Sequence, residues 1–163
     1  MNMEIIEISQ VNDYLAEMVA LFRVELRSYK GIVSKPNVDV GREEMEEYLA
    51  AGFPVFAAIV DGAYAGYVVC RVDSEVVWVE SIFVKEEYRR HSVASALHNK
   101  AEEIAASYGE DTVYNYVHPN NHRMIAFLRK RGYTVLNLIE IRKPYKGEQP
   151  TQTIRVGEHE FDY

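Results

Sequence analysis

Residues 84–97 read VKEEYRRHSVASAL, and this stretch decides the fold. The residues just before it, Val76–Val84, form an apolar run rich in β-branched and aromatic side chains, which predicts a buried strand. After it, apolar residues recur at helical spacing, and Gly109 can end the helix. The sequence therefore predicts a strand, a short basic turn, and a helix that begins at or near Ser92.

The predicted helix start has the features of an anion site. A helix N-terminus presents unpaired backbone N–H groups and about half a positive charge, which favour a bound phosphate. Arg89, Arg90 and His91 add cationic side chains at this point. The first turn is made of small residues, among them Ser92 and Ala94, so a bulky anion can approach the backbone.

This turn resembles the acyl-CoA signature of the GNAT superfamily of acetyl-CoA-dependent N-acetyltransferases, [Q/R]-x-x-G-x-[G/A]. Residues 89–94 read RRHSVA, so that Arg89 and Ala94 match and Ser92 replaces the glycine. Residues 121–133, NHRMIAFLRKRGY, are similar to a second signature of the superfamily, N-x-x-A-x-x-[L/F]-Y-x-x-x-G-[F/Y]. The two stretches occur in the family's order, and with their flanking strands the resemblance covers most of the chain.

Composition predicts one globular domain over residues 1–163. The chain is 48% hydrophobic and 26% charged, and it is long enough to bury a sizeable core. No apolar run is long enough to span a bilayer, and residues 1–4 lack a signal-peptide pattern. The single cysteine, Cys70, excludes an internal disulfide, fits a small buried hydrophobe better than a nucleophile, and suits a cytoplasmic protein.

Charge is distributed unevenly along the chain. The net charge is −7, which argues against a nucleic-acid partner, and no hydrophobic span predicts a membrane partner. Residues 1–84 carry 6 Lys/Arg against 14 Asp/Glu, whereas residues 85–143 carry 10 against 7. The basic segment holds both signature stretches and suits a ligand with several phosphates. The acidic part can attract a protonated amine, although a plain scatter of surface charges stays open.

The order of predicted elements is β-α-α-β-β-β-α-β-α-β-β. It describes an α+β fold with a mixed, mostly antiparallel central sheet of about seven strands and helices on both faces, and it matches the GNAT arrangement. We predict strands at 3–8, 54–60, 64–72, 76–84, 112–117, 133–141 and 153–156, with a further hairpin strand at 159–163. Helices are predicted up to about residue 29, at 40–51, at 92–108, and from Asn120 or Asn121 to Gly132.

The resemblance implies how acetyl-CoA binds. In the family, the strands that correspond to 76–84 and 112–117 separate in a V-shaped splay, and the pantetheine arm pairs with the freed strand edge. Backbone N–H groups of the basic turn hold the pyrophosphate. The residues implied in cofactor binding are Ile82, Phe83, Val84, Arg89, Arg90, His91, Ser92, Val93, Ala94, Ser95, Asn121 and Phe127. Simpler roles stay open: Ser92 and Asn121 as helix caps, Arg89 and Arg90 as solvent-facing side chains.

Glu80 is the candidate catalytic base, because a carboxylate inside an apolar strand is costly unless it is paired or functional. The alternative is that it faces solvent or pairs with a structural arginine such as Arg71. Leu128 occupies the position where many family members have a tyrosine acid, so the acid step is unassisted, water-mediated or assigned to another residue. Nearby candidates are Tyr88, Tyr114, Tyr116, Tyr133 and His118.

The sequence thus predicts an N-acetyltransferase that moves an acetyl group from acetyl-CoA to a primary amine by direct attack on the thioester. The alternative is an acyl-CoA-binding module that has lost strong catalysis, which Ser92 and Leu128 suggest. The histidines show no metal-ligand spacing, so no metal is expected. The acceptor, whether a small molecule or a peptide amine, is left open, and a homodimer through the C-terminal strands is possible.

Overall fold

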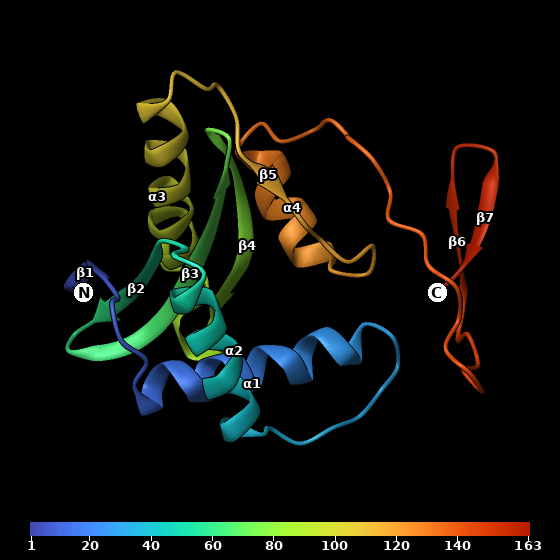
Figure 1. The fold of residues 1–163 in the computed structure, drawn as a ribbon, viewed down its shortest axis with the longest axis horizontal. Helices are drawn as coiled ribbons and strands as arrows, with labels where there is room; N and C mark the ends of the chain where they lie inside the picture. Colours follow the sequence, from blue (N-terminus) through green and yellow to red (C-terminus); the bar gives the residue numbers. More distant parts are fainter. The chain divides into compact units, whose positions relative to one another are not determined.

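The computed structural model describes all residues, 1–163, and their packing divides the chain into two compact units. Unit 1 comprises residues 1–25 and 34–116, and unit 2 comprises residues 26–33 and 117–163. Unit 1 holds β1 (Met3–Glu7), α1 (Asp13–Ser28, whose last turn belongs to unit 2), α2 (Val38–Ala50), β2 (Val55–Val60), β3 (Ala63–Asp73), β4 (Val76–Val84), the 3-10 helix η1 (Glu86–Tyr88), α3 (Val93–Ser107) and β5 (Tyr114–Asn115), as Figure 1 shows. Unit 2 holds α4 (His122–Lys130), β6 (Thr153–Val156) and β7 (His159–Asp162).

Unit 1 is built on a five-stranded sheet in the order β1-β2-β3-β4-β5. The first four strands are antiparallel neighbours, and β5 pairs with β4 in parallel. Asp61 and Gly62 both have positive φ, 48° and 83°, as the tight turn between β2 and β3 requires. The α+β fold class is confirmed, and β4 has the bounds that the sequence predicts.

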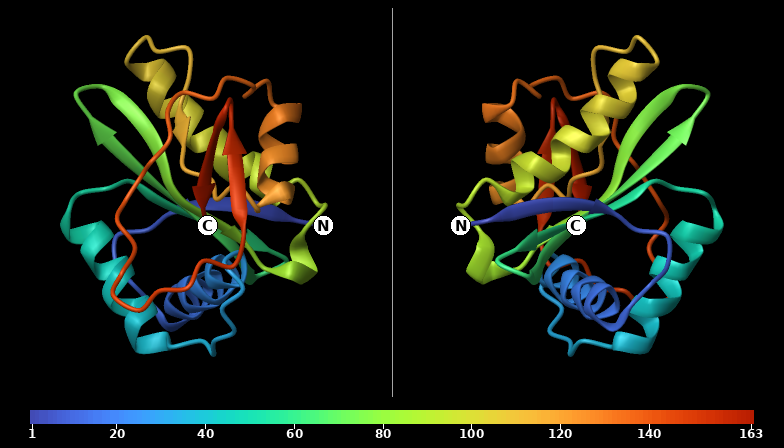
Figure 2. Two further views of the ribbon diagram at one scale, coloured as in Figure 1. Left: turned by 90° about the vertical axis from the view of Figure 1, so that its right-hand side faces the viewer. Right: turned by 90° about the vertical axis from the view of Figure 1, so that its left-hand side faces the viewer.

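Helices cover both faces of this sheet, as Figure 2 shows for unit 1. On one face, Leu15 and Met18 of α1 and Met45 of α2 pack against Tyr67 and Val69. On the other face, α3 lies along the strands, and an added Cβ at Gly66 of β3 would lie 3.2 Å from Leu97 Cδ1. Residues 65–70 of β3 are therefore buried from both sides, which explains their continuous apolar run.

The predicted splay lies at the junction of β4 and β5. Only Trp78 and Val79 of β4 pair with β5, through Tyr114 and Asn115. From Glu80 to Val84, β4 keeps β3 as its neighbour and has no strand on the other side. The strand expected at 112–117 is thus only two residues long, because the chain leaves β4 almost at once.

The C-terminal part differs from the sequence prediction. Residues 133–141, expected as a strand, have no regular secondary structure. β6 and β7 pair with each other in a separate two-stranded sheet, so the central sheet has five strands and not about seven. Apolar alternation in 133–141 indicates what such a segment prefers when it has a partner strand, but it does not supply the partner. No helix is long and apolar enough to cross a membrane.

Candidate active site

The basic turn between β4 and α3 presents a run of unpaired backbone donors. Arg90 and Ser92 both lie in the left-handed region, with φ of 64° and 62°. None of the backbone N–H groups from Arg90 to Ser95 donates to a protein acceptor, and the first helical bond at this end is Ala96 N–H to Ser92 O at 3.0 Å. Successive N–H groups in such a conformation form a concave anion site at a positive helix end.

The side chains around this turn leave the donors accessible. Arg90, His91 and Ser92 are exposed, and Ala94 and Ser95 are only partly covered. The Ser92 hydroxyl makes no capping bond to the helix, so the alternative of an ordinary serine cap is wrong. The serine nevertheless adopts the positive φ that a glycine at this position would adopt without strain.

Replacing Ser92 with glycine should therefore stabilise the fold. A left-handed non-glycine residue costs about 1–2 kcal/mol, and glycine returns part of this gain through the entropy of the unfolded chain. We expect the free energy of unfolding to rise by about 0.5–1 kcal/mol, measured by urea denaturation. Ser95→Gly is the control: Ser95 lies inside α3, so the same change there should destabilise the protein.

Arg89 braces the turn from inside. Its Nε donates to the Val84 carbonyl at 2.9 Å, and its Nη2 donates to the Glu25 carboxylate of α1 at 3.1 and 3.3 Å. The guanidinium also lies 5.7 Å from the Phe83 ring centroid. These contacts tie the end of β4 to the turn and to α1, so the Arg89 side chain positions the donor run. The alternative of a solvent-facing Arg89 is wrong.

Glu80 of β4 is paired with an arginine, as one alternative from the sequence proposed. Arg71 Nε donates to Glu80 Oε2 at 3.2 Å, and each side chain is 27% exposed. Arg71 is held in turn by the Tyr116 hydroxyl at 2.8 Å and by the Trp78 ring at 4.2 Å. Glu80 Oε1 makes no hydrogen bond to the protein, so one oxygen of an oriented carboxylate remains able to accept a proton.

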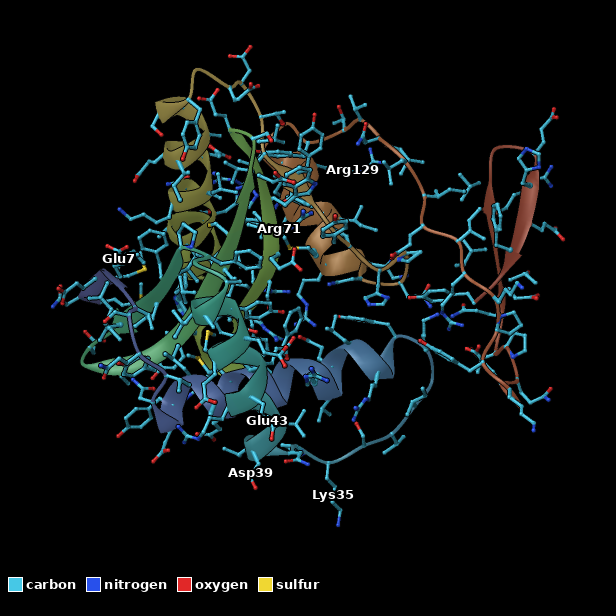
Figure 3. The ribbon with its side chains drawn as sticks, viewed as in Figure 1. Glu7, Lys35, Asp39, Glu43, Arg71 and Arg129 are labelled. Carbon is cyan, nitrogen blue, oxygen red and sulfur yellow. The ribbon has the colours of Figure 1, made fainter.

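A second carboxylate on α2 joins this polar region, and the sequence did not single it out. Glu44 accepts from Tyr48 Oη at 2.8 Å and pairs with Arg23 of α1. Burial, and then the Glu44 carboxylate, raise the pKa of Tyr48; the charge of Glu80 contributes in the same direction. Tyr48 therefore stays protonated as a donor. The other carboxylates of α2, such as Glu43, point into solvent, as Figure 3 shows.

The signal for Glu44 lay in helical phase and not in composition. All four glutamates of this helix look alike as an acidic run, but Glu44 lies one residue from the fully buried Met45. It is half-buried, whereas Glu43, Glu46 and Glu47 are exposed. A helical projection would have separated it from its neighbours.

A buried histidine fixes β5 at the start of the splay. His98 of α3 is fully buried, with Nδ1 3.1 Å from a Glu102 carboxylate oxygen and Nε2 2.9 Å from Asn115 Oδ1. The Asn115 amide nitrogen donates to the Val113 carbonyl at 3.3 Å, which orients Oδ1 toward the ring. The sequence classed His98 as a surface or core residue rather than a ligand; it is a core residue that ties α3 to β5.

In unit 2, Asn121 is the N-cap of α4. Its Oδ1 accepts from Met124 N at 3.1 Å, so the capping alternative holds, and its amide nitrogen makes no hydrogen bond to the protein. Phe127 is half-buried and lies 5.6 Å from the Arg131 guanidinium carbon. Leu128, at the position of the family's tyrosine, is buried. Contacts of Asn121 and Phe127 with a cofactor stay predictions.

His118 lies in a polar cluster of unit 2 that the sequence did not reveal. Its Nδ1 is 3.0 Å from the Tyr163 hydroxyl, and its ring centroid is 6.1 Å from that of Tyr29. Lys30 lies over the Tyr163 ring at 4.0 Å. Burial, and then the positive charge of Lys30, lower the pKa of His118, while Glu140 opposes them. His118 is therefore neutral near pH 7.

This depressed pKa has a consequence for stability. Below the unfolded pKa of about 6.5, the unfolded chain binds a proton at His118 that the folded chain resists. We expect the free energy of unfolding to fall as the pH is lowered from 7 to 5, and His118→Gln to flatten this slope in urea titrations. His159→Gln, at an exposed site on β7, should leave the slope unchanged; equal effects would contradict the assignment.

The residues present fit acetyl-CoA on two counts. An unpaired strand edge from Glu80 to Val84 can receive an amide-bearing arm, and the N–H groups from Arg90 to Ser95 can receive a pyrophosphate. No group of three or more His, Cys, Asp or Glu side chains is arranged to hold a metal ion.

Solved structures with the same fold are acetyltransferases of low sequence identity. An aminoglycoside N-acetyltransferase in complex with CoA is 23% identical, with a TM-score of 0.65 over 87% of this chain and 95% of that chain. The aminoglycoside 6'-N-acetyltransferase of Acinetobacter baumannii is 22% identical, with a TM-score of 0.61 over 88% and 99%. A GNAT-family acetyltransferase of Staphylococcus aureus is 19% identical, with a TM-score of 0.61 over 80% and 84%. These likenesses confirm the fold.

The family itself is shown by the sequence. The profile of the acetyltransferase (GNAT) family matches residues 18–133, which is most of the chain and includes α1 to α4 and the basic turn. Acetyl-CoA is accordingly the acyl donor, as the resemblance implied. The chain belongs to the GNAT family of acetyltransferases.

Proposed function

We propose that this acetyltransferase moves the acetyl group of acetyl-CoA to a primary amine of a small molecule or peptide, and that residues 1–163 act together as one catalytic domain. The observation that carries the proposal is the coincidence, within unit 1, of the free donor run at Arg90–Ser95, the open edge of β4, and the oriented carboxylate of Glu80 on that same strand.

The donor run supports a role in binding the acyl donor. N–H groups of Arg90 to Ser95 would bind the pyrophosphate, and the exposed side chains of Arg90 and His91 add positive charge beside it. The N–H and C=O groups on the free side of Ile82 and Phe83 would pair with the amides of the pantetheine arm. Val84 differs, since its carbonyl already accepts from Arg89. These contacts align the thioester with the amine, and proximity of this kind supplies much of the rate.

Glu80 would act on the acceptor. The thioester supplies an activated acetyl group when the donor is bound. The amine nitrogen forms the new bond to the carbonyl carbon, the carbon–sulfur bond breaks, and the amine proton passes to Glu80 Oε1, directly or through a water. Solvent can protonate the leaving thiolate, since Leu128 has no proton to give. The neighbouring carboxylate of Glu44 favours a cationic acceptor in the same region.

Release of free CoA thiol in the presence of a panel of amines tests this proposal. The panel includes aminoglycosides, since several proteins of the same fold acetylate them, together with polyamines, lysine and peptides with free N-termini. We expect thiol release that depends on one class of amine, with an acetylated product seen by mass spectrometry. Thiol release that no amine accelerates would contradict amine acetylation and leave acyl-CoA hydrolysis or binding alone.

A further inference from the structure

Residues 134–141 of unit 2 form an exposed apolar segment with no partner. They read TVLNLIEI, a strand-like composition, but they have no regular secondary structure and make no backbone hydrogen bonds. Val135 is 89% exposed, Leu136 70%, Leu138 68% and Ile141 66%. So many large apolar side chains in eight residues are unusual on a free surface and indicate an interaction site.

Both ends of this segment are anchored, so that it is presented as a fixed strand. On one side, α4 ends at Gly132, with φ of 91°, and Tyr133 N–H donates to Leu128 O at 3.0 Å. On the other side, Arg142 makes a bidentate pair with Glu148, at 2.9 and 2.8 Å. The segment between these anchors needs a partner strand and not a folded core of its own.

The sequence of the segment is symmetric about Asn137, and this symmetry points to the partner. On either side of Asn137 lie Leu136 and Leu138, and beyond them Val135 and Ile139. An antiparallel strand paired with a copy of itself, with Asn137 opposite Asn137, sets Leu136 against Leu138 and Val135 against Ile139 in both halves. Every one of these opposite pairs is apolar, and such pairs stabilise sheets.

The next pairs in this register are compatible as well. Thr134 faces Glu140, and Tyr133 faces Ile141, so no two like charges oppose each other. The asparagines meet on the two-fold axis, where their amides can hydrogen-bond to each other and disfavour shifted registers, as a buried asparagine does in coiled coils. A contact in which the same residues serve both copies is the ordinary form of a two-fold dimer.

We propose that residues 134–141 of two copies of this chain pair as antiparallel strands centred on Asn137 and form a homodimer. No edge within the chain matches this segment in length. The central sheet ends in β1, with five residues, and β5, with two, and the strands of the β6–β7 hairpin have four each. A second copy offers an edge of equal length and matching side chains.

Light scattering after size exclusion, over a range of protein concentrations, tests the association. We expect a dimer for the unmutated chain and a monomer for the Leu136→Lys, Leu138→Lys double variant, which places charges in the paired faces. Since these side chains are 70% and 68% exposed in the single chain, the variant should keep the unmutated circular dichroism spectrum. A monomer at all concentrations for the unmutated chain would overturn the proposal.

Cysteine cross-linking tests the register. In Asn137→Cys, the two thiols face each other across the axis at a Cα distance of about 5 Å, which suits a disulfide. We expect rapid intermolecular cross-linking under mild oxidation. Thr134→Cys is the matched control, because position 134 faces position 140 and not itself. The natural Cys70 does not interfere, since it is fully buried and burial raises its pKa to about 12. Equal cross-linking of the two variants would overturn the register.

Discussion

Substituting Ser92 with aspartate should lower the affinity for acetyl-CoA by at least about 100-fold, which corresponds to about 2.7 kcal/mol. Ser92 is exposed at the mouth of the donor run from Arg90 to Ser95, so a carboxylate there would lie against the pyrophosphate. Two unit charges about 4 Å apart repel by about 4 kcal/mol near a protein surface, and the carboxylate also competes for the same N–H groups. Calorimetric titration with acetyl-CoA and with CoA measures the loss.

Ser92→Asn is the matched control for this prediction. Asparagine has nearly the same shape as aspartate, tolerates the left-handed conformation that residue 92 adopts, and carries no charge. We expect Ser92→Asn to bind acetyl-CoA within a few-fold of the unmutated protein. A similar loss in both variants would point to steric blockage or altered folding, and equal binding by Ser92→Asp would contradict a phosphate site at this turn.

Replacing Glu80 with glutamine should lower kcat by about 100-fold or more, because general base catalysis contributes about 10²–10⁴-fold. Glutamine can still accept the hydrogen bond from Arg71, so the local structure should persist while the ability to take a proton is lost. The Kd for acetyl-CoA should not change. Steady-state rates with the amine that the panel identifies, together with calorimetry, separate these two effects.

Glu47→Gln is the control for Glu80→Gln. It removes the same charge from the same unit at an exposed position on α2, and we expect it to leave kcat nearly unchanged. If Glu80→Gln retained full kcat, proton removal would fall to water or to another group, and Glu80 would be reduced to a partner of Arg71. An equal loss in both variants would assign the effect to overall charge.

The central sheet was predictable because its strands carry strong local signals. The run Val76–Val84 and the Asp61-Gly62 turn determine three antiparallel strands, and the structure reproduces β4 residue for residue. The basic turn was predictable for the same reason: an apolar strand, cationic residues and a helical repeat follow one another directly. Such features depend on neighbouring residues, which the sequence displays in order.

Other features depended on contacts that no local pattern displays. Arg89 looked like a phosphate ligand, but it is bound to Glu25, which lies far away in the sequence. The strand at 133–141 was predicted from its apolar alternation, and the chain provides it with no partner strand. Pairing is a property of two segments, so composition alone predicts a preference for strand structure and not whether the strand forms.

The positive φ of Ser92 shows a third kind of difference. A serine at a glycine position suggested that the turn might lose its left-handed conformation, yet Ser92 keeps it, with φ of 62°. The surrounding strand and helix fix the path of the chain, and they outweigh a local cost of about 1–2 kcal/mol. The motif therefore survives its substitution in conformation.

Amide hydrogen exchange of the unmutated protein, with and without acetyl-CoA, tests the central claim most directly. The N–H groups from Arg90 to Ser95 have no acceptor in the protein, so they should exchange quickly in the free chain. If they bind the pyrophosphate, acetyl-CoA should protect them, together with the free edge of β4 near Ile82 and Phe83. Protection elsewhere with none at these residues would contradict the account of how this acetyltransferase holds its acyl donor.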